Sequence, residues 1–123
     1  MPFSDPYHHL AEIFECIVAV ESFVEGMTFK EFCAEEKTVA AVERKLSVIS
    51  EAAVRLGEAG PRLCPKIPWR DVRGIGNWLR HQYDRVDRET IWTTVERDLP
   101  PIKSSVFQIL EQERKKTQSP ASE

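Results

Sequence analysis

An apolar seam between residues 39 and 56 constrains the fold of this chain more than any other feature. Its members recur at alternating steps of three and four residues: Val39, Val42, Leu46, Ile49, Ala53 and Leu56. This spacing places them on one side of a long α-helix, and charged residues such as Glu43 and Arg44 fall off the seam. A seam of this length can face the chain's own core or continue into the interface of a dimer.

The other segments also have helical periodicity. Helix caps are expected at Asp5, which Pro6 follows, and at Thr28 and Asp87, while Gly26 is expected to end the first helix. Helices are expected at about 6–25, 39–56, 69–83 and 89–97, and again after Pro100-Pro101, which is expected to interrupt the chain. No segment alternates as a strand does. We therefore expect an all-α fold, an antiparallel bundle of four to five helices.

Composition bounds the organisation of the chain. Its 123 residues suit one domain, and 41% of them are hydrophobic, which is enough for one modest core. We expect a helical domain over residues 1–114 and a disordered tail over 115–123, which has almost no apolar residues. Three irregularly spaced cysteines, no signal peptide and no apolar stretch of membrane-spanning length predict a cytoplasmic protein with reduced thiols.

A basic segment lies within an otherwise acidic chain. Residues 62–88 contain seven basic and three acidic side chains, a local net charge of +4, against −3 for the whole chain. Such a segment favours an anionic partner, either a nucleic acid or an acidic protein surface. The alternative is that these arginines pair with the chain's own acidic residues.

The helix expected over 69–83 divides into two faces. A core-facing arc contains Val72, Ile75, Leu79 and Tyr83. A second arc, of roughly 100°, gathers three guanidiniums, a carboxamide and an imidazole: Arg70, Arg73, Asn77, Arg80 and His81. This second arc is the candidate functional surface.

Two glycines lie inside this helix, although each costs about 1 kcal/mol relative to alanine in a helix interior. Gly74 lies at the edge of the polar face beside His81, where it can leave room for a ligand or another chain. Gly76 lies toward the apolar face, where it can let a neighbouring helix approach closely. Both could instead serve packing alone, and Trp78 is expected to pack or form an interface rather than stack on a base.

The polar face has the parts for cleaving RNA without a metal ion. Histidine moves protons near neutral pH, and arginine binds phosphate oxygens through a planar fork. A base would activate the ribose 2′-hydroxyl, arginine would stabilise charge on phosphorus, and an acid would protonate the leaving oxygen. His81 supplies one such group per chain, so two copies across a dimer would complete the set. The alternative is a solvated histidine with no catalytic function.

Two other candidate motifs are weaker. His8, His9 and Glu12 lack the spacing of a zinc site, so we expect surface residues there and no metal site. Gly74-x-Gly76 is not a phosphate-binding loop, because no strand precedes it and no lysine follows it.

Several runs in the basic segment resemble the HepT-like proteins of the HEPN superfamily, the domain of unknown function 86 group. They are Ile67-Pro68-Trp69-Arg70-Asp71-Val72-Arg73-Gly74-Ile75, then Asn77 and Leu79, His81-x-Tyr83, and Asp98-Leu99-Pro100-Pro101. Upstream, residues 46–53 resemble the family's long-helix signature, with Ser50 where glycine is usual. The resemblance covers residues 6–112.

This resemblance implies a dimeric all-α toxin of a type II toxin–antitoxin system, encoded beside a minimal nucleotidyltransferase, the MntA-type antitoxin. It implies metal-independent RNA cleavage without a cofactor. Carried over, His81 is the catalytic residue, assisted by Arg73, Arg80 and Asn77, and RNA binding falls to Arg70, Arg73 and Arg80. Tyr83 is the position at which the partner can AMPylate and silence the toxin.

The chain departs from the family's catalytic signature at the arginine. Five residues before His81, where that arginine is usual, stands Gly76. Arg73 lies about 12 Å along the helix axis from His81, against about 7.5 Å for the usual spacing. Arg73 or Arg80 can substitute, from the same or the other protomer. Two functions therefore stay open: a HepT-like ribonuclease toxin, and a non-catalytic module whose basic face docks a nucleotidyltransferase or another partner.

Overall fold

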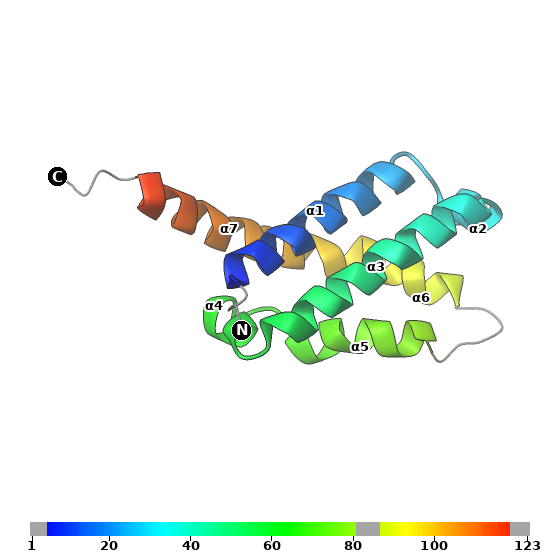
Figure 1. Ribbon diagram of the computed structural model, residues 1–123. Helices are drawn as coiled ribbons and strands as arrows, with labels where there is room; N and C mark the ends of the chain where they lie inside the picture. Colours follow the sequence, from blue (N-terminus) through cyan, green and yellow to red (C-terminus); the bar gives the residue numbers. More distant parts are fainter. Residues whose placement is uncertain (1–4, 81–86, 119–123) are drawn as a thin grey trace.

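The computed structural model describes residues 5–80 and 87–118, and every regular element in these ranges is a helix. In chain order these are α1 (Pro6–Val24), α2 (Phe29–Ala34), α3 (Glu36–Leu56), α4 (Ala59–Leu63), α5 (Trp69–Arg80), α6 (Arg88–Thr93), the π-helix η1 (Thr94–Asp98) and α7 (Leu99–Gln118). Figure 1 shows the long elements side by side, each running against the one before it, with the end of α7 projecting beyond the bundle. The expected all-α antiparallel bundle is confirmed.

The predicted helix boundaries rest on local polar contacts. Asp5 Oδ1 accepts a backbone N–H of the first turn of α1 at 3.0 Å, and Asp87 does the same for α6 at 3.0 Å. Thr28 forms a reciprocal capping box on α2. Gly26 and Gly57 follow the ends of α1 and α3 with φ of 77° and 53°, a conformation that residues with a Cβ rarely adopt.

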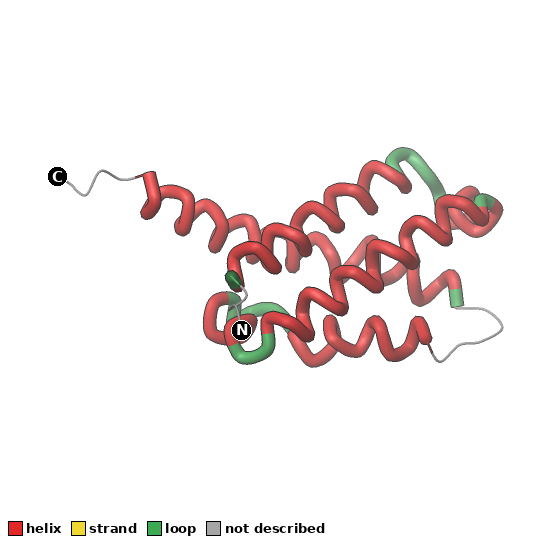
Figure 2. The backbone as a smooth tube through the Cα atoms, viewed as in Figure 1, coloured by secondary structure: helices red, strands yellow, loops and turns green. Residues whose placement is uncertain are grey.

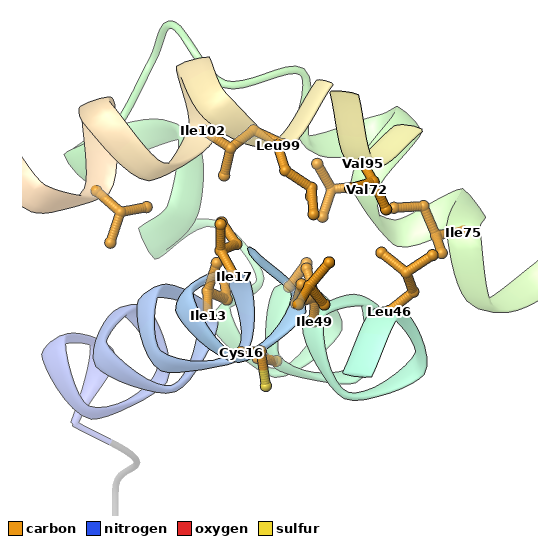
Figure 3. Close-up of a cluster of buried hydrophobic side chains, with 14 of the residues drawn as sticks. Ile13, Cys16, Ile17, Leu46, Ile49, Val72, Ile75, Val95, Leu99 and Ile102 are labelled. Atoms are coloured by element: carbon orange, nitrogen blue, oxygen red, sulfur yellow. The ribbon is translucent and has the colours of Figure 1, made fainter. Parts of the chain in front are cut away.

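The seam of α3 forms the centre of the core, and all six of its members are buried. Helices α1 and α5 both pack on α3, and α7 packs on α1. Figure 3 shows Ile13, Cys16 and Ile17 of α1, Leu46 and Ile49 of α3, Val72 and Ile75 of α5, and Val95, Leu99 and Ile102 of η1 and α7 in one cluster. The seam therefore serves the chain's own core.

The interruption expected at Pro100-Pro101 is wrong, because α6, η1 and α7 follow one another without a loop (Figure 2). Proline has no N–H, so the two prolines cannot donate to the carbonyls four residues before them. The turn ahead of them widens into a π-helix, in which the Leu99 N–H donates to the Thr94 carbonyl. The prolines change the type of helix instead of ending it.

Other differences concern single residues and segment ends. The sequence does not predict α4. Helix α7 continues to Gln118, so residues 115–118, expected in the tail, are helical, whereas 119–123 lie outside the described residues. His8 is exposed as expected, but His9 is buried because it shares a helix face with Ile13, and neither of its ring nitrogens has a hydrogen-bond partner.

Candidate active site

The start of helix α5 is held by a buried tryptophan. Trp69 is 5% exposed, and its indole N–H donates to the Cys64 carbonyl at 2.9 Å. Its ring lies so close to Gly60 of α4 that a Cβ there would be 3.0 Å from it. These contacts fix the first turn of α5 against the loop and short helix that precede it.

The predicted polar face of α5 is exposed to solvent over the whole described helix. Its exposed residues are Arg70, Arg73, Asn77 and Arg80. The opposite side is buried at Val72, Ile75 and Gly76, and Leu79 is half-buried. The division into two faces is therefore confirmed for residues 69–80. His81 and Tyr83 lie outside the described residues.

Within the described residues, the arginines of this face form no ion pair with an acidic side chain. Among residues 5–80 and 87–118, every ion pair is formed by other side chains, and Arg70, Arg73 and Arg80 take part in none. Three unpaired guanidiniums and one carboxamide on the surface of a single helix form a set of donors that suits phosphate oxygens. In the part of the chain that the structure describes, no group of three histidine, cysteine or acidic side chains is placed to hold a metal ion.

Ser50 of α3 connects directly to the backbone of α5. Its hydroxyl is buried, accepts the Gly76 N–H at 2.9 Å and donates to the Arg73 carbonyl at 2.8 Å. A Cβ on Gly76 would lie 2.8 Å from Ser50 Oγ and 3.3 Å from Arg80 Nη1. Gly76 thus allows the close helix approach predicted for it, and Ser50 bridges the turn from Arg73 to Gly76.

A groove of about 630 Å³ lies on the other flank of α5, between this helix and the η1–α7 segment. Its α5 wall includes Arg70, Asp71, Gly74, Ile75 and Trp78. Its second wall includes Thr94, Arg97, Asp98, Leu99, Pro101, Ile102 and Ser105. Arg70 therefore belongs both to the polar face and to the groove.

Sequence reasoning missed the Ser50 bridge and the second wall of the groove. The second wall does contain part of the family resemblance, since three of the four residues of Asp98-Leu99-Pro100-Pro101 line the groove. Ser50 stands where the family usually has glycine, and this difference marks the position in the sequence. The neighbouring residues do not show that its hydroxyl reaches a helix more than twenty residues away in sequence.

Comparison with known proteins places the chain in a family. The model of the family described as "Ribonuclease HepT-like" matches residues 13–109. The chain belongs to the HepT-like family. This match contains α5, Ser50 and every residue that lines the groove, so the site described above lies in the part that defines the family.

Individual HepT-like relatives agree with this assignment. A protein of Thermococcus cleftensis named "Probable ribonuclease HepT" is 37% identical over 95 residues, which cover 77% of this chain and 86% of that protein. A candidate RNase of Methanocaldococcus jannaschii is 35% identical over 100 residues, which cover 81% of this chain and 83% of that protein. Another, from Caldanaerobacter subterraneus, is 30% identical over 100 residues, which cover 81% and 88% respectively. No solved structure matches this HepT-like chain.

Within the described ranges of this HepT-like chain, no helix is long and apolar enough to cross a membrane.

Proposed function

We propose that this HepT-like chain is a metal-independent endoribonuclease that acts as a dimer in the cytoplasm. The observation that carries the proposal is the exposed, unpaired basic face of α5, which ends at Arg80 and is followed directly in sequence by His81. The family match and the relatives named as ribonucleases support RNA as the substrate.

The proposed reaction is a transesterification, in which the phosphate is transferred from the 5′-oxygen of one nucleotide to the 2′-oxygen of the preceding ribose. His81 of one protomer takes the proton of the 2′-hydroxyl, and the freed oxygen attacks phosphorus. The bond to the 5′-oxygen breaks, and that oxygen takes a proton from the protonated His81 of the other protomer. The products are a 2′,3′-cyclic phosphate and a 5′-hydroxyl. Arg73 and Arg80 stabilise the charge that develops on phosphorus, and Asn77 orients the phosphate.

In the cell we propose that this activity is that of a toxin in a type II toxin–antitoxin pair. The partner would be an MntA-like nucleotidyltransferase that neutralises the enzyme and modifies Tyr83. Co-expression with a small nucleotidyltransferase encoded beside this gene should raise the intact mass by one AMP group. The Tyr83→Phe variant should not gain this mass.

The test of the nuclease is cleavage of RNA by purified protein in the presence of a chelator. His81→Ala should lose the activity, and Arg80→Ala should reduce it, because each removes a proposed chemical group. His8→Ala is the matched control, since His8 is an exposed histidine on a different helix. Equal activity in the parent and His81→Ala would mean that a contaminant cleaves the RNA, and cleavage that needs added zinc would contradict the mechanism.

A second function is favoured by Gly76. A Cβ there would lie 2.8 Å from the Ser50 hydroxyl, so the usual arginine is absent and could be accommodated only if Ser50 moved. In that case the basic face docks the nucleotidyltransferase without cleaving RNA. A pull-down of the partner should then fail when Arg73, Arg80 and His81 are changed to alanine together, and capture that survives the three changes would exclude docking through this face.

A further inference from the structure

No contact or backbone conformation in the described residues explains Gly74. Its φ is not in the left-handed region that favours glycine, because only Gly26 and Gly57 have positive φ among the described glycines. A Cβ built on Gly74 would meet no atom within 4 Å. Alanine would therefore fit, and it would stabilise the helix. A glycine that the fold does not require points to something that approaches the helix from outside.

The place of approach is the groove, because Gly74 forms part of its α5 wall. The volume of about 630 Å³ falls within the usual range of small-ligand pockets. The opposite wall is formed partly by the π-helix η1, and π-helical turns occur frequently at functional sites. One wall of the groove therefore contains Gly74, which no described contact explains, and the other wall contains a π-helix.

The chemistry of the walls selects the kind of occupant. The half-buried Trp78 and the exposed Pro101 offer aromatic and apolar surface, which suits a flat ring. Asp71 and Asp98 offer carboxylate oxygens, which accept hydrogen bonds from exocyclic amino groups. Arg70 continues from the groove onto the polar face, so a ring in the groove can be joined to a phosphate on that face.

We propose that the groove binds one unpaired, amino-bearing base of the RNA, with its adjoining phosphate on Arg70. The proposal rests on the proposed function, which supplies RNA as the ligand. It extends that function by assigning recognition of a base to the groove between α5 and the η1–α7 segment. It also gives Trp78 a binding role beyond the packing role expected from the sequence, and it explains Gly74 as the point where the ring comes close to the helix backbone.

The experiment compares two labelled hexanucleotides by fluorescence anisotropy. One carries adenine bases on 2′-O-methyl riboses, and the other has the same backbone without bases. Neither has a free 2′-hydroxyl, so binding is measured without cleavage. The parent should bind the adenine strand about fivefold or more tightly than the abasic strand, as expected when a base stacks in a protein site.

Two variants test the groove itself. Gly74→Leu places a side chain on the groove wall, and it should remove the preference for adenine while the affinity for the abasic strand changes by less than about twofold. Gln108→Leu is the matched control, because Gln108 is an exposed helical residue outside the groove, and it should keep the preference of the parent. Gly74→Ala should melt at a higher temperature than the parent, which establishes that the wall tolerates a Cβ.

The outcomes separate this proposal from the proposed function. Equal affinity of the parent for the two strands, or failure to bind either, would overturn the base site even if His81-dependent cleavage is observed. A base preference lost in Gly74→Leu would support the site even if no cleavage is found. A preference that persists in Gly74→Leu while light scattering shows that a dimer has dissociated would overturn the proposal and assign the groove to a second copy of the chain.

Discussion

Replacing Gly76 with arginine would restore the family's usual arginine five residues before His81, and the structure predicts that this change alone is destabilising. The new Cβ would lie 2.8 Å from Ser50 Oγ, so Ser50 must turn away from the backbone groups it now bridges. A buried hydroxyl without partners costs about 1–3 kcal/mol, and overpacking adds about 1–3 kcal/mol. Replacing a helix-interior glycine returns about 1 kcal/mol.

The net loss for Gly76→Arg is therefore about 3 kcal/mol, the middle of a range of roughly 1–5 kcal/mol. At about 4 °C per kcal/mol for a domain of this size, the melting temperature should fall by about 12 °C. Typical domains are stable by about 5–15 kcal/mol, so the variant should still fold and can be measured by urea denaturation.

The decisive measurement is a double-mutant cycle with Ser50→Gly. In the parent, Ser50→Gly removes two hydrogen bonds and should destabilise by about 1–2 kcal/mol. In Gly76→Arg it removes the clashing hydroxyl, so the same change should be neutral or stabilising. The coupling free energy should be about 1–3 kcal/mol, as is usual for residues in contact.

Ser47→Gly is the control for this cycle, since Ser47 lies one turn earlier on α3 and forms none of these contacts. Its effect should add to that of Gly76→Arg within about 0.5 kcal/mol. If Ser50→Gly were equally additive, the reasoning from the close approach of the two helices would be refuted. If the double variant Ser50→Gly with Gly76→Arg cleaves RNA faster than the parent, the arginine spacing limits activity in this chain.

Two further predictions concern the buried parts of the fold. Gly60→Ala should lower the free energy of unfolding by about 1–3 kcal/mol. The new Cβ would lie 3.0 Å from the ring of Trp69, and a hydrogen bond holds that ring in place. An unchanged midpoint of urea denaturation would contradict this prediction. In the folded protein, iodoacetamide should modify the half-buried Cys33 first. Burial shields Cys16 and Cys64 from the reagent and also raises the pKa of both thiols. Peptide mass mapping measures the three rates, and equal rates would argue against the described burial.

The fold was predictable where its cause is local. The caps at Asp5, Thr28 and Asp87 and the seam of α3 each depend on residues two to four positions apart, and the structure confirms all of them. The continuity of α6, η1 and α7 was not predictable in this way. Whether two prolines end a helix or widen it depends on how the flanking segments pack, and this is decided by distant parts of the chain.

The same holds for the candidate site, where the features set by local spacing were predictable and those set by long-range contacts were not. The polar face of α5 follows from the angular spacing of residues on one helix, so Arg70, Arg73, Asn77 and Arg80 are exposed as predicted. The Ser50 bridge spans more than twenty residues of sequence, and the groove joins α5 to a segment that follows it by a similar distance. The periodicity of a sequence shows which side of a helix is buried, but it does not show which atoms of other helices contact that side.

The two glycines of α5 show what the structure adds to this. In the sequence both weaken a helix interior by about the same amount, and only their positions on the polar and apolar faces distinguish them. In the structure, a Cβ on Gly76 would lie 2.8 Å from the Ser50 hydroxyl, whereas a Cβ on Gly74 would meet no described atom within 4 Å. Replacing the first glycine should therefore destabilise the fold, whereas replacing the second should not. If the weaker helix at Gly74 serves a purpose, that purpose lies in what binds to the groove, so Gly74→Ala should stabilise the protein and Gly74→Leu should impair binding.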